Sequence, residues 1–219
     1  MNTLVISDIH EPFSHPRAIA HCKMVGEKYN AKKVVFVGDI IDHHRISRHV
    51  SELDSFGATV ELRLTKRKLK KWIKAFPTAH ILLGNHDLIP YRQAKELGMP
   101  KAFLKDLHKV YNIPSLGWKF SKRLILGNVL YLHNAGSGKY AAINKAKEMS
   151  MSVVCGHTHR HGGVIYFSNP RQLFFGMNVG CLIDKSAYAM RYFEGEPTCG
   201  CGVVINSELA YFEPMKMGR

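Results

Sequence analysis

Five short apolar segments, each followed at once by polar residues, constrain the fold of this chain more than any other feature. Such segments are typical of strands buried on both faces of a sheet. The clusters that follow them are Asp8-Ile9-His10, Gly38-Asp39, Gly84-Asn85-His86-Asp87, His133 and Gly156-His157-Thr158-His159. Because ligands of α/β sheets bind outside the carboxyl ends of the strands, we expect these side chains to meet in one place.

The alternation of strands and helices predicts an α/β fold. We expect strands over 3–7, 33–37 and 79–83, with helices over 15–29 and 51–76 between them. This order is typical of a parallel sheet with helices on its faces. Further along the chain we expect a helix over 139–149 and strands over 122–126, 129–133, 152–155, 163–167, 203–205 and 210–212. Residues 177–184 and 191–193 are expected to continue a second sheet.

The length of 219 residues suits a single domain that spans the whole chain. Residues 88–122 are weakly patterned and contain three prolines, so we expect a small insertion there, near the mouth of the site. This segment would act either as a cap that limits substrate size or as a contact between two copies. The sequence leaves both readings, and the oligomeric state, open.

The balance of charges favours an anionic partner. Lysine and arginine total 31 against 17 aspartates and glutamates, which gives a net charge of +14. Such an excess is typical of proteins that bind nucleic acid, nucleotides or phosphorylated metabolites, although it also serves solubility. The expected helix carries a basic run at 66–74 opposite apolar Leu62, Leu69, Ile73 and Phe76. A run of this kind is more often a solvated helix face than a binding stripe.

Other classes are disfavoured. No apolar run reaches the ~18 residues that a membrane span needs, so we expect no membrane partner. The N-terminus enters an apolar run that Asp8 interrupts early, which indicates a strand rather than a signal peptide and predicts a cytoplasmic protein. Five cysteines are an odd count, which argues against a full disulfide framework.

The polar clusters supply donors for metal ions. The candidate ligands are Asp8, His10, Asp39, Asn85, His133, His157 and His159. Oxygen and nitrogen donors without thiolate suit manganese, iron, zinc, cobalt or nickel better than magnesium or calcium. Seven donors exceed one site and fit two divalent ions that share a carboxylate. Two such ions ~3.5–4 Å apart clamp an in-line displacement and lower the pKa of a bound water toward ~7. This predicts hydrolysis of a phosphate ester by a metal-bound hydroxide.

Each cluster alone has a structural alternative. Asp8 and His10 are a turn or cap pair as often as a ligand pair, and they point the same way only if the strand continues. Gly38-Asp39 alone is compatible with a tight turn, and Asn85 to Asp87 with the start of a helix. The pair His157 and His159 beside a glycine has few structural uses.

The five clusters, in this order, closely resemble the calcineurin-like metallophosphoesterase family. Its marks are D-x-H, GD-x-x-D, GNH-[DE], a histidine and GH-x-H, and the resemblance spans residues 4–159. It implies a four-layer α/β/β/α sandwich. It also implies that one metal is held by Asp8, His10, Asp39 and His159, and the other by Asp39, Asn85, His133 and His157. Manganese is the metal that the resemblance favours.

The resemblance also implies roles beside the metals. His86 would face the leaving group as general acid or transition-state stabiliser, with Asp87 orienting and charging it. Asp42 would lie behind a ligand histidine. Many family members carry a glycine beside the fifth-block histidine, whereas here His133 stands between Leu132 and Asn134. Rivals for this ligand are His43, His44 and His161.

The family covers several kinds of substrate, and the motifs do not choose among them. The basic charge favours a phosphodiesterase acting on a nucleotide or nucleic acid, with Arg45, Arg160 and His161 as candidate substrate-binding residues. The alternative is a phosphomonoesterase acting on small metabolites or phosphoproteins. A non-catalytic binding scaffold is disfavoured, because it predicts missing ligands and the set here is complete.

Overall fold

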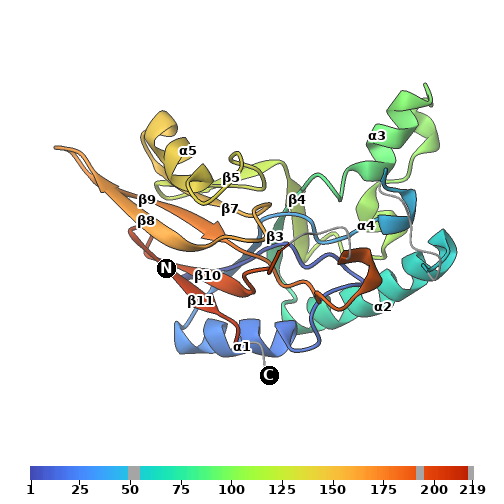
Figure 1. The fold of residues 1–219 in the computed structure, drawn as a ribbon, viewed down its shortest axis with the longest axis horizontal. Coiled ribbons are helices and arrows are strands. Elements are labelled where there is room, and N and C mark those ends of the chain that lie inside the picture. The colour runs from blue at the N-terminus through green and yellow to red at the C-terminus, as the bar shows by residue number, and fades with distance from the viewer. Residues whose placement is uncertain (49–54, 191–194, 217–219) are drawn as a thin grey trace.

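A computed structural model describes residues 1–48, 55–190 and 195–216 as two sheets that pack face to face (Figure 1). The first sheet has the strand order β11-β10-β1-β2-β3-β4. Its strands are β1 (Thr3–Ile6), β2 (Lys33–Phe36), β3 (Ala79–Leu82), β4 (Trp118–Ser121), β10 (Gly200–Ile205) and β11 (Leu209–Pro214). Strands β1 to β4 are parallel, and β10 and β11 join antiparallel beside β1.

The second sheet has the order β5-β6-β7-β9-β8. Its strands are β5 (Arg123–Leu126), β6 (Val129–Leu132), β7 (Ser152–Cys155), β8 (Gly162–Ser168) and β9 (Leu173–Val179). Strands β6, β7 and β9 are parallel, and an antiparallel strand borders them on each side. Both sheets therefore have a parallel centre whose strand ends can carry a site.

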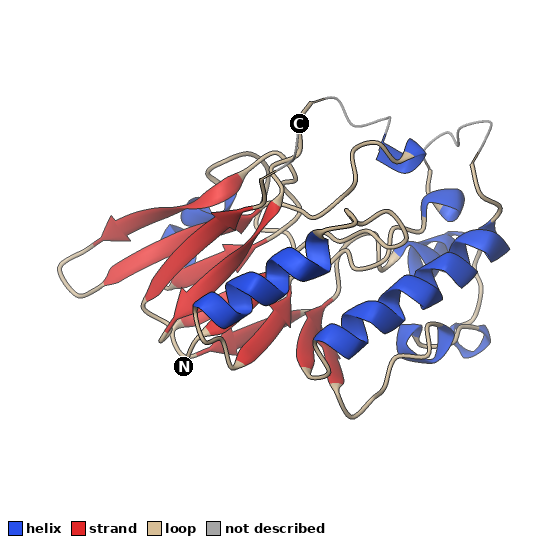
Figure 2. Cartoon of the chain, turned by 90° about the horizontal axis from the view of Figure 1, so that it is seen from below, coloured by secondary structure: helices blue, strands red, loops and turns tan. Residues whose placement is uncertain are grey.

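Helices cover the outer faces, which completes four layers. Helices α1 (Ala18–Lys28) and α2 (Ala58–Ala75) pack on the first sheet, and α5 (Ala141–Met149) packs on the second. Helices α3 (Ile89–Glu96) and α4 (Leu107–Val110) lie to one side of the sheets (Figure 1). Short 3₁₀ turns are η1 (His44–Ile46), η2 (Lys101–Phe103) and η3 (Tyr188–Met190). In Figure 2 α1 lies in front of the strands, and the longer α2 lies to its right and extends past them. The expected four-layer α/β/β/α sandwich is confirmed.

Three apolar layers hold these elements together. One lies between the first sheet and helices α1 and α2, and it includes Leu69 and Trp72. The second fills the space between the sheets, where Val35 of β2 and Val154 of β7 are fully buried. The third packs Ala146 of α5 against Val153 of β7. Trp72 and Trp118 are the largest of the fully buried side chains in the described residues, and truncating such a residue costs about 3–5 kcal/mol.

Some element boundaries differ from expectation. Within the described residues α2 begins at Ala58, not near residue 51, and residues 49–54 lie outside the description. Its buried face includes Trp72 between the predicted Leu69 and Phe76. Strand β4 lies inside the expected insertion of 88–122 and begins at Trp118, which is buried. The part of this segment that lies outside the sheets therefore ends before Trp118.

The second sheet also ends earlier than expected. Strand β9 stops at Val179, because Gly180 has a φ of +68° and turns the chain. Residues Cys181 and Ile183 then form isolated bridges to Cys199 and Ser14. The predicted strand at 191–193 lies outside the described residues. The five cysteines are free, and no described helix has the length and apolar character to cross a membrane.

Candidate metal centre

Loops that follow five strands meet at one edge of the sandwich. They come after β1, β2 and β3 of the first sheet and after β6 and β7 of the second. The loops after β1 and β2 are joined by backbone hydrogen bonds from Asp8 N–H to Gly38 O (3.1 Å) and from His10 N–H to Asp39 O (3.0 Å). The loops after β6 and β7 are joined by one from Gly156 N–H to His133 O (3.0 Å). The polar residues that follow neighbouring parallel strands therefore lie close together.

The backbone of these loops is left-handed rather than extended. Asp8, His10, Asp39 and His157 have φ values of 48°, 44°, 48° and 66°. The strand does not continue through Asp8 and His10, so these two side chains reach the same group of donors from a left-handed and not an extended backbone. Non-glycine residues adopt this region at an energetic cost, and such strain gathers at functional sites where the surroundings hold it in place.

Carboxylates hold the strained loops by accepting backbone hydrogen bonds. Asp8 Oδ2 accepts from His157 N–H at 2.9 Å, and Asp39 Oδ1 accepts from His86 N–H at 2.7 Å. The glycines of the motifs make room for this. A Cβ atom on Gly84 would overlap Asp39 Oδ1 and one on Gly156 would overlap Asp8 Oδ2. Glycine is required at both positions by close approach of a carboxylate.

The first group of donors consists of Asp8, His10, Asp39 and His159, whose ligand atoms all lie within 4.8 Å of one another. His159 Nε2 lies 2.9 Å from Asp8 Oδ1 and 3.2 Å from His10 Nε2. The side chains of Asp8, His10 and Asp39, which follow strands of the first sheet, are almost fully buried. The side chain of His159 is partly exposed. An ion bound here would thus reach solvent on the side of His159.

The second group consists of Asp39, His133 and His157. His133 Nε2 lies 3.1 Å from Asp39 Oδ2 and 2.9 Å from Asn85 Oδ1, so the amide of Asn85 belongs to the same cluster. The rings of His133 and His157 meet edge to face with centroids 5.1 Å apart. Asp39 is the residue common to both groups, and its Oδ2 also lies 3.8 Å from His10 Nε2.

These separations suit donors that share a metal ion. Ligands bound at about 2.1 Å and at right angles or tetrahedral angles lie about 3.0–3.4 Å apart. Several donor pairs in both groups lie close to this separation, and both groups combine carboxylate with imidazole, which suits first-row transition metals. The donor set therefore fits a pair of divalent cations with Asp39 between them.

Hydrogen bonds behind the histidines fix which ring nitrogen faces the cluster. His10 Nδ1 lies 2.6 Å from Asp42 Oδ1, and His133 Nδ1 lies 2.8 Å from the carbonyl oxygen of Val37. A carboxylate and a carbonyl only accept hydrogen bonds, so both Nδ1 atoms carry the proton. The Nε2 atoms are left to act as donors to a metal, which is how metal-binding histidines are usually oriented.

The electrostatics of the cluster favour charged groups despite burial. Burial alone disfavours ionisation of Asp39, but His133 and His10 outweigh it and lower the pKa of its carboxyl to about 2. Burial likewise opposes protonation of His133, but Asp39 raises its pKa to about 9. In the same way, His10 and His159 hold the pKa of Asp8 well below its ordinary value against the effect of burial. A cation that replaced these protons would meet carboxylates that are already ionised.

His86 lies beside the first group without belonging to its donors. Its ring centroid is 4.6 Å from that of His10. His86 Nδ1 donates to the backbone oxygen of Asp42 at 2.8 Å and lies 3.4 Å from the Asp42 carboxylate. Burial and the neighbouring His10 lower the pKa of His86, but Asp42 and Asp39 outweigh them and raise it. The nitrogen that this arrangement leaves uncommitted is Nε2.

The expected pairing of Asp87 with His86 is wrong. Asp87 is fully buried, and its carboxylate accepts hydrogen bonds from Ile41 N–H (3.0 Å) and Gly84 N–H (2.8 Å). It fastens the loop after β3 to the loop after β2. Among the described residues the carboxylate beside the His86 ring is that of Asp42, which lies 45 positions from Asp87 in the chain. The sequence motif placed the wrong acid next to the histidine, because adjacency in a loop does not set side-chain direction.

The rival ligands occupy other positions. His43 is bonded to the backbone of His86 and to Tyr111. His44 is buried against the rings of Phe13 and Tyr188. Neither these two nor His161 belongs to the two groups formed around Asp39 within the described part of the chain. His133 does, so the structure places it, rather than its rivals, among the donors.

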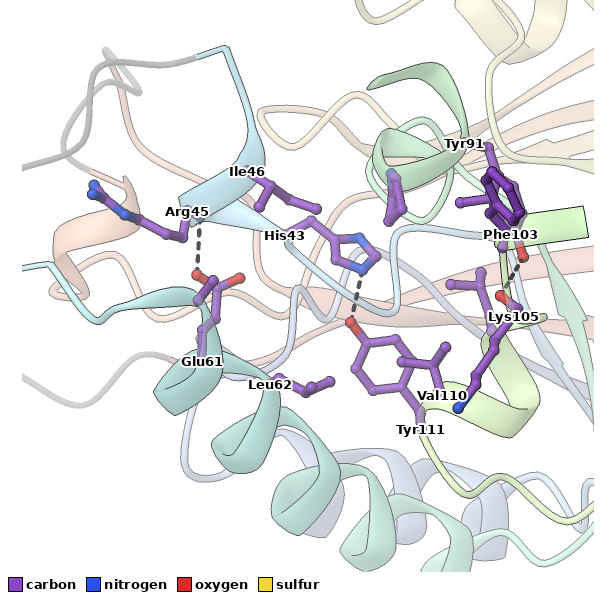
Figure 3. Close-up of a pocket in the computed structure, with 14 residues that line it drawn as sticks. His43, Arg45, Ile46, Glu61, Leu62, Tyr91, Phe103, Lys105, Val110 and Tyr111 are labelled. Atoms are coloured by element: carbon purple, nitrogen blue, oxygen red, sulfur yellow. Dashed lines mark hydrogen bonds between the residues drawn. The ribbon is translucent and has the colours of Figure 1, made fainter. Parts of the chain in front are cut away.

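The candidate substrate-binding residues make other contacts, and they are not among the described donors of the two groups. Arg45 is exposed, its backbone N–H is bonded to Glu61, and Figure 3 shows its side chain directed away from the adjacent cavity. Arg160 is exposed with its guanidinium beside Gly195, and the backbone of His161 is bonded to that of Thr158. Their roles toward substrate stay predictions.

Two arginines that the sequence did not single out do lie next to His86. A cavity of about 300 Å³ is lined by Arg48, Arg92, Asn85 and His86, among other residues. Arg92 donates from Nη2 to the backbone oxygen of Asn85 at 2.9 Å, and Arg48 is paired with Glu96. In the sequence both look like ordinary surface arginines, so only the packing of α3 against the loop after β2 reveals them.

Comparisons with known proteins give one family match. A family model described as calcineurin-like phosphoesterase matches residues 1–152. A search of curated protein sequences found no match. Among solved structures, Vacuolar Protein Sorting 29 from Cryptosporidium parvum is 10% identical, with 99% of this chain and 98% of that chain covered and a TM-score of 0.46. The nuclease MPE from Pseudomonas putida is 11% identical (97% and 87% covered, TM-score 0.48), and a metallophosphoesterase from Sphaerobacter thermophilus is 14% identical (99% and 88%, TM-score 0.48).

Proposed function

Because this chain belongs to the calcineurin-like phosphoesterase family, we propose that it hydrolyses phosphate esters with two divalent cations and favours diesters of nucleotides or nucleic acid. One observation carries this proposal. A single carboxylate oxygen, Asp39 Oδ2, faces histidines of two separate donor groups, at 3.1 Å from His133 Nε2 and 3.8 Å from His10 Nε2. An oxygen in this position is suited to bridge two ions.

We assign the donors as follows. Asp8, His10 and His159 would hold one ion together with Asp39, and Asn85, His133 and His157 would hold the other. When bound, such a pair of cations supplies a water of lowered pKa and positive charge for the phosphoryl oxygens. Manganese is our proposed metal, since the mixed carboxylate, amide and imidazole set accepts it. Asp42 would keep His10 in its metal-binding tautomer through the 2.6 Å contact with Nδ1.

His86 is our proposed proton donor to the leaving group. Its Nδ1 is held by the backbone oxygen of Asp42, and its pKa is raised by Asp42 and Asp39 against the effects of burial and His10. A raised pKa favours the protonated ring, from which Nε2 would donate to the oxygen that departs. The ring lines the cavity that also holds Asn85, so a substrate bound there would lie within its reach.

The preference for diesters rests on charge beside the site. Arg48 and Arg92 line the same cavity as His86, and the chain carries a net charge of +14. Guanidinium groups bind phosphate in a fixed, two-pronged geometry. Because they share this cavity with His86, the two guanidinium groups would contact the part of a diester beyond the leaving oxygen, such as a further phosphate or a sugar–phosphate chain. A small monoester has no such group.

A panel of metals and substrates tests the proposal. Chelated enzyme is reloaded with manganese, zinc, iron, nickel or cobalt and assayed with bis(4-nitrophenyl) phosphate and 4-nitrophenyl phosphate. We expect manganese-dependent hydrolysis with a higher kcat/KM for the diester. A higher kcat/KM for the monoester would select the alternative, a phosphomonoesterase acting on metabolites or phosphoproteins. A steep loss of oligonucleotide binding with salt would indicate a polymeric substrate.

The remaining alternative is a binding scaffold without activity. The complete set of donors argues against it, because a scaffold has no need of seven converging donors and a partly buried His86 held by hydrogen bonds. The variant His86→Gln separates the two functions. We expect hydrolysis to fall by about 10²–10⁴-fold, with manganese content unchanged by elemental analysis. Wild-type protein that binds two ions yet hydrolyses no ester would favour the scaffold.

A further inference from the structure

A second cavity lies beside the loop that follows β2, and His43 of this loop forms part of its wall. It has a volume of about 420 Å³ and lies among η1, α2, α3 and α4. Its walls are mainly apolar, with Leu62, Phe103 and Val110 among them (Figure 3). Two polar side chains on its wall, His43 and Tyr111, point toward each other (Figure 3). Both are buried, with 6% and 5% of their surface exposed.

Hydrogen bonds connect these two side chains to His86. Tyr111 Oη lies 2.7 Å from His43 Nε2, and His43 Nδ1 lies 2.9 Å from the backbone oxygen of His86. The carbonyl oxygen only accepts, so Nδ1 carries the proton and Nε2 of a neutral ring accepts from the tyrosine hydroxyl. Burial, despite the His86 carbonyl, lowers the pKa of His43 to about 4, which keeps the ring neutral and this direction of donation intact.

These hydrogen bonds, together with two others, hold His86 at three points. His86 N–H donates to Asp39, its ring donates to the backbone of Asp42, and its carbonyl accepts from His43. His43 is itself held in a left-handed conformation, with φ of 56°. Non-glycine residues persist in that region where the surroundings impose it. Tyr111, just after α4, supplies the outermost contact, so a segment outside both sheets is tied to the metal-side loop.

We propose that Tyr111 and His43 are positioning residues for His86, setting the direction of its ring through its backbone carbonyl. The inference rests on the proposed function, in which His86 donates a proton to the leaving group. Neither residue belongs to the two donor groups around Asp39 in the described part of the chain. Their effect is therefore on the proton transfer and not on the binding of ions.

This role makes a specific kinetic prediction. A good leaving group such as 4-nitrophenolate departs with little protonation, whereas phenolate needs a proton in the transition state. Loss of the support should thus slow diphenyl phosphate hydrolysis far more than bis(4-nitrophenyl) phosphate hydrolysis. A merely structural fault would slow both substrates by the same factor, because it would reduce the fraction of competent enzyme.

The variant Tyr111→Phe removes the hydroxyl and keeps the ring. Its matched control is Tyr91→Phe, since Tyr91 lines the same cavity but its hydroxyl donates to the backbone oxygen of Lys105 and not to His43. We expect Tyr111→Phe to lower kcat for diphenyl phosphate about tenfold or more, and kcat for the nitrophenyl diester by less than about threefold. We expect Tyr91→Phe to change neither, and manganese content to be equal in all three proteins.

Two further variants bear on the mechanism of the effect. In a His86→Gln background the Tyr111→Phe change should have no additional effect on either substrate, because the group it positions is gone. His43→Gln keeps a donor for the His86 carbonyl and an acceptor for the tyrosine, whereas His43→Leu keeps neither. We therefore expect His43→Gln to retain several-fold more activity on diphenyl phosphate than His43→Leu.

A readout without catalysis separates this inference from the proposed function. The ring resonances of His86 in the manganese-free protein are followed by NMR and assigned with His86→Gln. We expect them to shift in Tyr111→Phe and to stay unchanged in Tyr91→Phe. If wild-type protein hydrolyses neither diester, the proposed function fails while this comparison still decides the positioning. Unshifted His86 resonances, or equal loss on both diesters, would overturn the inference.

Discussion

His10 Nε2 lies 3.2 Å from His159 Nε2, so two imidazole nitrogens face each other across the first donor group. The proton on His10 Nδ1 is committed to Asp42, and His159 Nε2 also lies 2.9 Å from Asp8 Oδ1. Without a cation, at least one of the two facing nitrogens must carry a proton to avoid opposed lone pairs. A metal ion bound between them would displace that proton.

Manganese binding should therefore release protons. The pKa of His133 is about 9, because Asp39 outweighs the effect of burial, so this ring is protonated in the metal-free protein below that pH. The proton must leave before Nε2 can bind a metal, so affinity should rise with pH between 6 and 9, by up to about tenfold per pH unit for each proton released. Calorimetry in two buffers with different ionisation enthalpies measures the release. An affinity that does not change over this range would contradict the assignment of His133.

Asp42→Asn should weaken both metal binding and hydrolysis. Asp42 contacts Nδ1 of His10 at 2.6 Å and lies 3.4 Å from Nδ1 of His86, so one change removes charge behind a ligand and beside the proposed acid. We expect manganese affinity to fall about 10–100-fold, and kcat at saturating metal to fall as well. Metal titration and steady-state kinetics measure the two effects.

Asp87→Asn is the matched comparison for this change. Its carboxylate accepts two backbone N–H groups, and an asparagine amide nitrogen cannot replace one of those acceptors. We expect a loss of about 1–3 kcal/mol in the free energy of unfolding, with the pH profile of the folded enzyme unchanged. Denaturant unfolding and a pH–rate profile distinguish the two variants. An altered profile in Asp87→Asn alone would restore the pairing of Asp87 with His86.

Gly84→Ala should disrupt the centre without touching a ligand. The added Cβ would overlap Asp39 Oδ1 and approach the Asp39 backbone, so the shared carboxylate must move. We expect manganese affinity to fall at least about tenfold. Gly57→Ala is the control, because its Cβ would meet no atom within 4 Å, and we expect its stability to change by no more than about 0.5 kcal/mol. Equal metal binding by the two variants would show that Asp39 tolerates the displacement.

Glu61→Gln should change how stability depends on pH. Burial raises the pKa of Glu61 to about 7 in the folded protein, although the Arg45 N–H opposes the shift. The folded state therefore keeps a proton that the unfolded chain has released, and the free energy of unfolding falls as pH rises from 4.5 to 7. The glutamine of the variant does not ionise, so this decrease is absent. From pH 4.5 to 7 the free energy of unfolding of Glu61→Gln should therefore rise relative to that of wild type by on the order of 1–3 kcal/mol.

Urea unfolding at several pH values measures this difference. Glu27→Gln, an exposed residue of α1, controls for removal of a carboxylate from the chain. A constant difference between Glu61→Gln and wild type from pH 4.5 to 8 would show that Glu61 ionises as it does in the unfolded chain.

Much of this protein was readable in its sequence. Buried strands show as continuous apolar runs because both of their faces meet other layers, and the alternation with helices predicted the parallel sheet that contains β1, β2 and β3. The donors were found for the same reason. Each lies immediately after such a run, and parallel strands bring their carboxyl ends to one edge. The first residues after a strand therefore have their position in space set by local structure and sheet order together.

Only the tertiary structure decided which groups touch within that edge. Asp42 rather than Asp87 lies beside His86, and His43 links Tyr111 to the same residue, although no spacing in the sequence connects them. The physical reason is that side-chain direction in these loops depends on left-handed backbone angles at residues such as Asp8 and His10. Those angles cost energy locally and are maintained by hydrogen bonds from other strands, so periodicity along the chain carries no record of them.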